Sequence, residues 1–227
     1  MIIYQYKNGY RYNSDSLILY DFIRADKLKG LGLDIGTGSG ILSILMSENK
    51  NIKIDALDIQ EENAKLCELN FKENNINYQV ILSDIKDYKV YNHYDFIISN
   101  PPFYSKMQAS NKHLNTSRHI DFMPLEIFLK SCDKLLKPHG FLYFCYDAKK
   151  IDLIFQLMQN TKLKCEKIRF IHTKIDKTAN LVLIKARKLS KSDIQILPAL
   201  ICHEDNGLSE ELNNIYQNIK VHSYDLQ

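Results

Sequence analysis

Short apolar runs alternate along the chain with longer stretches in which apolar residues recur every three or four positions. The first pattern is typical of buried β-strands and the second of amphipathic helices. Seven runs are predicted as strands: Leu31–Ile35, Ile52–Leu57, Tyr78–Leu82, Asp95–Ser99, Gly140–Tyr146, Lys164–Ile171 and Thr178–Ala186. Six segments are predicted as helices: Asp15–Ile23, Ile41–Ser47, Glu61–Phe71, Leu125–Leu136, Ile151–Asn160 and Leu208–Asn218. Ser14 or Asp15 is the expected N-cap of the first helix.

This alternation predicts an α/β fold, a doubly wound and mostly parallel seven-stranded sheet with helices on both faces. Only the short polar segment HTKIDK separates the last two strands, so we expect them to form an antiparallel hairpin at one sheet edge. The sequence shows no internal repeat and no clear domain boundary. We therefore expect one domain over residues 1–227, with short additions at both ends.

The composition is that of an ordinary soluble globular protein, with 45% hydrophobic and 25% charged residues in a chain of 227. No apolar run approaches the roughly 20 residues that cross a bilayer, and the N-terminus lacks a signal-peptide pattern. The five cysteines are odd in number and have no CxxC spacing. That argues against a disulfide framework and a zinc site, so we expect a cytoplasmic protein without a metal or membrane partner.

The net charge of +3 is small, but its distribution is uneven. Between Lys130 and Lys191 there are 15 Lys and Arg against five Asp and Glu, so the rest of the chain is net acidic. Such a division can create a face for an anionic partner such as a nucleic acid. The alternative is a solvated Lys-rich surface.

The segment LDIGTGSG predicts a strand followed by a glycine turn and the start of a helix. Gly36, Thr37, Gly38 and Gly40 form this turn, in which the absence of side chains lets a ligand approach the backbone. The spacing is GxGxG rather than the GxGxxG of dinucleotide-binding proteins, and Asp34 precedes it. A carboxylate there repels a pyrophosphate and attracts an amine. The pattern therefore favours S-adenosylmethionine, which carries an ammonium and a sulfonium, over a nicotinamide cofactor.

Two more acidic residues follow neighbouring strands. Asp58 ends the second strand, beside Ile59, and is predicted to accept both ribose hydroxyls of a nucleoside. Asp84 follows the third strand and is predicted to accept from an adenine amino group, while Ile85 packs on the adenine ring. An isolated Asp at a strand end is often only a helix cap. The combination with the glycine turn, each motif after its own strand, favours a cofactor site.

The fourth strand leads into ISNPPF and ends at Asn100, on the same carboxyl edge of the predicted sheet. Pro101 and Pro102 have no N–H group and a fixed φ, so this segment presents carbonyl acceptors without a competing donor. The side-chain carbonyl of Asn100 and a backbone carbonyl can accept both protons of a planar NH₂ group, and Phe103 can stack on the attached ring. We therefore predict methyl transfer to an amino nitrogen, catalysed by alignment without a protein nucleophile or a metal. The alternative is a proline-stiffened strand exit with Phe103 in the core.

LDIGTGSG, ALD, LSDI and ISNPPF, in this order, resemble class I S-adenosylmethionine-dependent methyltransferases of the NPP[YF] type. Within these, the chain resembles the bacterial tRNA1(Val) adenine-37 N6-methyltransferases. The similarity includes GYRYNSDSLIL and LPALICHEDNGLSEELNNIY, and so covers nearly the whole chain. The resemblance implies a Rossmann-like fold, methylation of adenosine N6 in a tRNA anticodon loop, and a place for Asp15 at the border of the cofactor site. Where family members often carry Arg-His-Glu, this chain has Arg118, His119 and Ile120.

Residues 104–123 are predicted to form a long polar loop after the catalytic segment. Lys106, Lys112 and Arg118 in it are candidates for phosphate contacts with RNA, although a mobile surface loop would have the same composition. The N-terminal YQYKNGYRY could stack on nucleotides or form an edge hairpin. The sequence leaves open a protein glutamine N5-methyltransferase, an rRNA guanine-N2 methyltransferase and a catalytically silent RNA-binding module. It does not indicate an oligomeric state.

Overall fold

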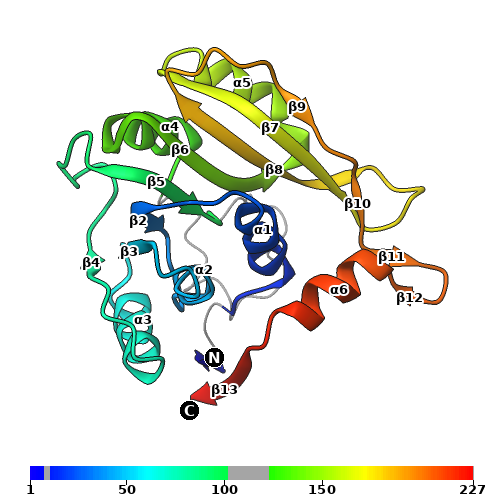
Figure 1. The fold of residues 1–227 in the computed structure, drawn as a ribbon, viewed down its shortest axis with the longest axis horizontal. Coiled ribbons are helices and arrows are strands. Elements are labelled where there is room, and N and C mark those ends of the chain that lie inside the picture. Colours follow the sequence, from blue (N-terminus) through cyan, green and yellow to red (C-terminus); the bar gives the residue numbers. More distant parts are fainter. Residues whose placement is uncertain (8–10, 102–122, 227) are drawn as a thin grey trace, which may run out of the picture.

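The structure, a computed structural model, describes residues 1–7, 11–101 and 123–226 (Figure 1). The predictions for Pro102, Phe103, Lys106, Lys112 and Arg118 lie outside these residues. The main strands are β2 (Gly30–Ile35), β3 (Ile52–Asp58), β4 (Val80–Leu82), β5 (Tyr94–Ser99), β6 (Leu136–Asp147), β7 (Leu163–His172) and β8 (Ala179–Lys188). The helices are α1 (Ser14–Arg24), α2 (Ile41–Met46), α3 (Glu61–Glu73), α4 (Leu125–Leu135), α5 (Ile151–Met158) and α6 (Glu210–Asn218).

The strands form one central sheet in the order β10-β7-β8-β6-β5-β2-β3-β4, so the α/β prediction is confirmed. Neighbouring strands from β6 to β4 are parallel, whereas β8 is antiparallel to both β6 and β7, which confirms the predicted hairpin. In the described part of the chain the sheet has nine strands rather than seven. The two additional strands, β9 (Gln195–Ile196) and β10 (Leu200–Ile201), are two residues long and pair with β7.

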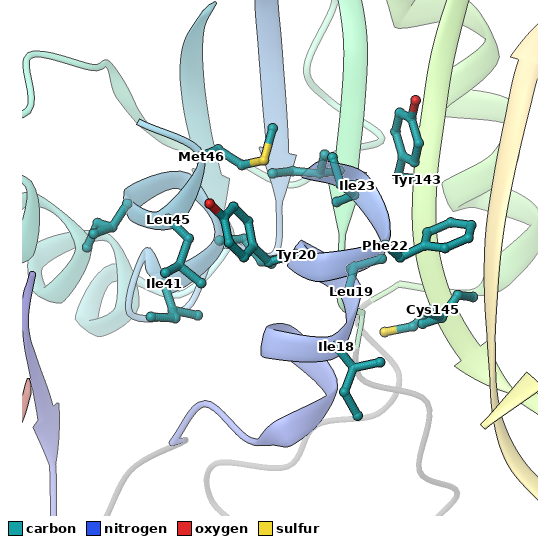
Figure 2. Packing of buried hydrophobic residues seen from close by; sticks show 14 of the residues in the cluster. Ile18, Leu19, Tyr20, Phe22, Ile23, Ile41, Leu45, Met46, Tyr143 and Cys145 are labelled. Atoms are coloured by element: carbon teal, nitrogen blue, oxygen red, sulfur yellow. The ribbon is translucent and has the colours of Figure 1, made fainter. Parts of the chain in front are cut away.

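Helices cover both faces of the sheet, each over its own apolar cluster (Figure 1). One cluster joins the sheet to α1, α2 and α3 through residues such as Leu19, Ile44 and Phe71. The other joins it to α4 and α5 through residues such as Phe128 and Ile154. Figure 2 shows α1 lying between α2 and strand β6. Helix α1 therefore packs against the carboxyl half of the sheet, where a ligand site is expected in such folds.

Several predicted element boundaries are wrong, and three of them have a clear local cause. The N-cap of α1 is Asn13, whose side chain accepts from the backbone N–H of Asp15, rather than Ser14 or Asp15. Helix α6 begins at Glu210 because Ser209 caps it and accepts from Leu212, while Leu208 belongs to β12 (Gly207–Leu208), which pairs with β11 (His203–Glu204). Strand β6 begins directly after α4, because Leu136 is extended and pairs with Tyr94.

The two ends of the chain pair with each other (Figure 1). Strand β1 (Ile2–Tyr6) lies parallel to β13 (His222–Leu226), in a small separate sheet, so the interpretation of the N-terminal tyrosines as a hairpin is wrong. The other edge of β1 is bonded by two asparagines four residues apart, Asn70 on α3 and Asn74, the C-cap of that helix. Asn70 bonds Tyr4 at both N–H (2.7 Å) and C=O (3.0 Å), and Asn74 does the same for Ile2. The two side-chain amides thus pair with backbone N–H and C=O groups of β1, as the backbone of a neighbouring strand would.

Candidate active site

The glycine turn joins β2 to α2 at the carboxyl edge of the sheet. The backbone N–H groups of Gly36 and Thr37 donate to Leu57 of the neighbouring strand, at 2.8 and 3.1 Å. Gly36, Gly38 and Gly40 have φ of 69°, 55° and 82°, in the left-handed region that favours glycine. At Gly40 a Cβ would also lie only 2.8 Å from the Cys67 sulfur. The glycines thus allow the sharp turn and the close packing of α3 against it.

Asp34 is buried beneath this turn, with 1% of its surface exposed. Its Oδ2 accepts hydrogen bonds from Thr37 Oγ1 (2.8 Å) and Ser43 Oγ (2.9 Å). Burial raises the pKa of Asp34 to about 6; these two bonds oppose the rise and the charge of Asp58 adds to it. Within the described residues, Asp34 Oδ1 and Ser39 Oγ are buried polar atoms without a hydrogen-bond partner. A carboxylate oxygen and a hydroxyl beneath the turn thus have unused hydrogen-bonding capacity, and both are buried from solvent in this structure.

Asp58 braces the glycine turn from the end of β3. Its Oδ2 accepts from the N–H of Gly38 and its Oδ1 from the N–H of Gln60, both at 2.9 Å. Asn63 on α3 donates to both oxygens at 3.3 Å. Burial raises the pKa of Asp58 in spite of these bonds. These four contacts fill the acceptor sites of both carboxylate oxygens, so a ribose hydroxyl would have to displace one of the long bonds from Asn63. The binding roles of Asp58 and of the half-buried Ile59 stay predictions.

Asp84 and Ile85 follow β4. The Asp84 carboxylate accepts from the N–H of Lys86 at 3.0 Å and pairs with the Lys86 ammonium at 2.7 Å. Burial opposes its charge, but the bonds from Lys86 hold the pKa of Asp84 below its usual value. Ile85 is buried in the same apolar cluster as Ile35 and Leu57. An adenine amino group would thus share Asp84 with a lysine, and its role in binding stays a prediction.

Asn100 lies where β5 meets the glycine turn. The preceding Ser99 donates through its hydroxyl to the Ile35 carbonyl at 2.7 Å, which fixes the end of β5 against β2. The Asn100 amide nitrogen donates to Ser16 Oγ on α1, and its carbonyl oxygen accepts from the Cys145 thiol on β6, both at 2.9 Å. The residue before Ser16 is Asp15, whose pKa is raised by burial. The cofactor and catalytic candidates therefore lie on α1 and at the carboxyl ends of β2, β3, β4 and β5, along one edge of the sheet.

Several residues of this site are not among those predicted from the sequence. Asn63, Ser16 and Cys145 each bond a predicted site residue. Ser16 lies in the GYRYNSDSLIL segment, beside the predicted Asp15, whereas Asn63 and Cys145 lie in none of the motifs. Asn70, fully buried on α3, donates to the Ser39 carbonyl in the glycine turn at 2.8 Å. Among the described residues no group of three or more His, Cys, Asp or Glu could hold a metal ion. None of the described helices combines the length and apolar character needed to cross a membrane.

The strand order, the glycine turn with acidic residues after the neighbouring strands, and the Asn-Pro at the end of β5 define a class of protein. They are the features of a Rossmann-like class I methyltransferase. The chain belongs to the methyltransferase small domain family, because the model of that family matches residues 11–171, well over half its length. Family and fold together imply S-adenosylmethionine as the cofactor.

Two curated relatives are similar over most of their length. The tRNA1(Val) (adenine(37)-N6)-methyltransferase of Aliivibrio fischeri is 29% identical over 183 residues, or 79% of this chain and 77% of the relative. The protein of the same name from Aliivibrio salmonicida is 26% identical over 213 residues, or 89% and 87%. The solved structure of a predicted O-methyltransferase from Agrobacterium tumefaciens has a TM-score of 0.69 at 15% identity and covers 93% of this chain and 100% of its own. The last likeness concerns the fold alone.

Proposed function

We propose that this protein transfers the methyl group of S-adenosylmethionine to N6 of an adenosine in tRNA, at position 37 of an anticodon loop. The observation that carries the proposal is the amide of Asn100, fixed at the sheet edge beside the glycine turn. Relatives that are named for this reaction align with 79% and 89% of the chain. The geometry supports the class of reaction, and the relatives support the base and the RNA.

On the cofactor side, the unpaired oxygen of Asp34 suits the amine of S-adenosylmethionine, and Asp58 suits its ribose hydroxyls. Asp84 and Ile85 would border its adenine, and Asp15, the residue before Ser16 on α1, would lie at the border of the cofactor site. When bound, S-adenosylmethionine supplies a methyl group on a sulfonium, which is a good leaving group. Desolvation by the buried turn and alignment of the methyl group are then the main tasks of the protein.

On the substrate side, the adenine amino nitrogen is a poor nucleophile because its lone pair is delocalised into the ring. Asn100 Oδ1 and a carbonyl of the Pro101–Pro102 segment would accept hydrogen bonds from its two N–H groups and direct the lone pair at the methyl group. With the cofactor bound, a nitrogen–carbon bond would form as the carbon–sulfur bond breaks, which leaves a neutral thioether, and the methylated nitrogen would lose one proton to solvent. An anticodon-loop adenosine is unpaired, so bringing it to Asn100 costs less than extracting a base from a duplex.

Transfer of labelled methyl to unmodified tRNA, followed by nucleoside digestion, tests the proposal. We expect the label in N6-methyladenosine, and none in a matched transcript in which adenosine 37 is replaced by guanosine. Label in N2-methylguanosine would assign the reaction to guanine. Transfer to a glutamine-bearing protein in place of tRNA would identify a protein methyltransferase. Binding of RNA without methyl transfer to any of these substrates would indicate a catalytically silent RNA-binding module.

A further inference from the structure

The Asn100 amide is held from both sides by residues outside the Asn-Pro-Pro-Phe segment. The Cys145 thiol donates to Asn100 Oδ1, and Asn100 Nδ2 donates to Ser16 Oγ, each at 2.9 Å. Ser16 is 3% exposed and Cys145 is fully buried. Figure 2 shows the Cys145 sulfur directed from β6 toward helix α1, the helix that carries Ser16. Two long-range contacts, across 84 and 45 residues of sequence, thus converge on one side chain.

These neighbours favour one orientation of the amide. Burial raises the pKa of Cys145 well above its ordinary value, and the nearby charge of Asp15 adds to this, so the thiol keeps its proton and acts as a donor. Turning the amide over would replace the bond from the thiol to the carbonyl oxygen with one from the NH₂ group to sulfur, which is a weak acceptor. The carbonyl oxygen therefore faces Cys145 and the nitrogen faces Ser16.

The thiol leaves the carbonyl oxygen available for a second partner. A carbonyl oxygen has two lone pairs, and a thiol is a weak donor that occupies one of them without strongly competing for the other. Alignment within a fraction of an ångström decides the rate of a reaction that relies on positioning. An amide free to rotate would present its oxygen to the substrate only part of the time.

We propose that Ser16 and Cys145 are positioning residues for Asn100, which hold its amide so that one lone pair of Oδ1 stays directed at the amino group of the substrate. This rests on the proposed function, in which Asn100 contacts that amino group. Neither residue touches the substrate in this scheme. Both act through Asn100, which makes their effect separable from a general role in packing.

A double-mutant cycle tests the dependence on Asn100. We expect Ser16→Ala and Cys145→Ala each to lower the single-turnover rate of methyl transfer about tenfold, because the amide loses its fixed orientation. The KM for tRNA and the affinity for S-adenosylmethionine should change less than about twofold. In an Asn100→Ala background, either change should cost nothing further. An equal loss in both backgrounds would show a packing role and overturn the proposal.

Conservative and control variants distinguish loss of the hydrogen bonds to Asn100 from a general effect on packing. Cys145→Ser and Ser16→Thr keep the donor and the acceptor, so we expect each to retain most of the rate that the alanine variant loses. Cys132→Ala is the matched control, because Cys132 is also fully buried but lies on α4, in the other apolar cluster. It should leave the rate unchanged. Failure of both conservative variants to retain activity, while they melt at the wild-type temperature, would contradict the proposal.

A readout that needs no activity separates this inference from the proposed function. The two side-chain amide protons of Asn100 can be assigned in ¹⁵N spectra by their loss in Asn100→Ala. We expect Ser16→Ala and Cys145→Ala to shift or broaden this pair, and Cys132→Ala to leave it in place. If these shifts occur but the wild-type protein methylates no tRNA, the proposed function is contradicted, while the contacts of Ser16 and Cys145 with Asn100 are supported. Unchanged resonances in both variants would overturn the positioning role, whatever the substrate.

Discussion

The Asp34 carboxylate has one oxygen that accepts two hydrogen bonds and one that is unpaired within the described residues. With a pKa of about 6, its charged fraction rises from about a tenth at pH 5 to nine tenths at pH 7. We expect the affinity for S-adenosylmethionine to rise about tenfold over this range, because the ionised carboxylate attracts the ammonium of the ligand. Calorimetry at a series of pH values would measure it. Asp34→Asn should bind weakly and without this rise.

Asp84→Asn is the matched control, because the pKa of Asp84 is lowered and its carboxylate stays charged over the same range. It should weaken binding but keep the dependence on pH. The stability of the ligand-free protein should change in the opposite direction. The folded pKa of Asp34 lies above its unfolded value, so its contribution to stability falls as pH rises from about 4 to 6. The same pH slope of affinity in Asp34→Asn and wild type would contradict the assignment.

The sequence identifies some of these side chains and cannot identify others. Asp34, Asp58 and Asn100 each follow a readable apolar run, and parallel strands bring such ends to one edge. The partners of these residues are set by tertiary packing. Ser16 and Cys145 reach Asn100 from elements 84 and 45 residues away, and no spacing rule relates positions at such separations.

Among the secondary-structure elements, α3 links the N-terminal strand to the glycine turn. The Asn70 amide bonds Tyr4 of β1 at both polar groups and the Ser39 carbonyl of the turn. We expect Asn70→Ala to lower the free energy of unfolding by about 2–3 kcal/mol, because it leaves buried backbone groups unpaired. It should also weaken the binding of S-adenosylmethionine by loosening the turn. Urea denaturation and calorimetry would measure the two effects.

Asn74→Ala provides the control for this prediction. Asn74 bonds Ile2 of β1 and the Asn70 carbonyl, but it does not touch the glycine turn. It should destabilise β1, seen as faster amide hydrogen exchange in residues 2–6, and leave cofactor affinity unchanged. Equal losses of affinity in both variants would show that the Asn70–Ser39 bond does not support the turn.

Periodicity predicts the long elements and misses the short ones. All seven predicted strands and six helices are present, and most of them bury a continuous apolar face. Strand β4 does not, since Val80 and Ile81 are only half-buried and Leu82 is exposed. Strands β9 and β10 are too short for an alternating pattern, and β1 pairs with a strand at the opposite end of the chain.

Strand β8 continues to Lys188, a charged residue that the apolar pattern excludes from the predicted strand. Its ammonium is buried and donates to Leu136 O at 2.8 Å and to Asn92 Oδ1 at 3.0 Å.

Across the whole molecule, part of the basic excess between Lys130 and Lys191 is balanced by acidic residues from elsewhere. Lys167 and Lys185 both pair with Asp26, Lys137 with Asp95, and Arg169 with Glu211. The sequence shows the uneven distribution of charge but not these ion pairs. A count of charged residues along the chain therefore overestimates how basic the surface is. Lys149 and Lys150 are exposed directly after β6, on the carboxyl edge that also carries Asn100.

We expect these two lysines to contribute phosphate contacts with the proposed tRNA substrate. Lys149→Glu with Lys150→Glu should weaken tRNA binding and reduce the slope of log affinity against log salt by about one per lost contact. Cofactor affinity should not change. Lys27→Glu with Lys29→Glu, which alters exposed residues just before β2 at the opposite edge, is the control of equal charge. Equal weakening by both pairs would show a general charge effect rather than a binding edge.

The most direct test is the single-turnover rate of methyl transfer to adenosine 37 of unmodified tRNA by the wild-type protein and by Asn100→Ala, with the cofactor affinity of both measured in parallel. Asn100 is expected to orient the reacting nitrogen, so its loss should lower the rate on the order of 10²–10³-fold. The affinity for S-adenosylmethionine should change little, because Asp34, Asp58 and the glycine turn are intact. A full rate in Asn100→Ala, with N6-methyladenosine as the product, would contradict this account of the site.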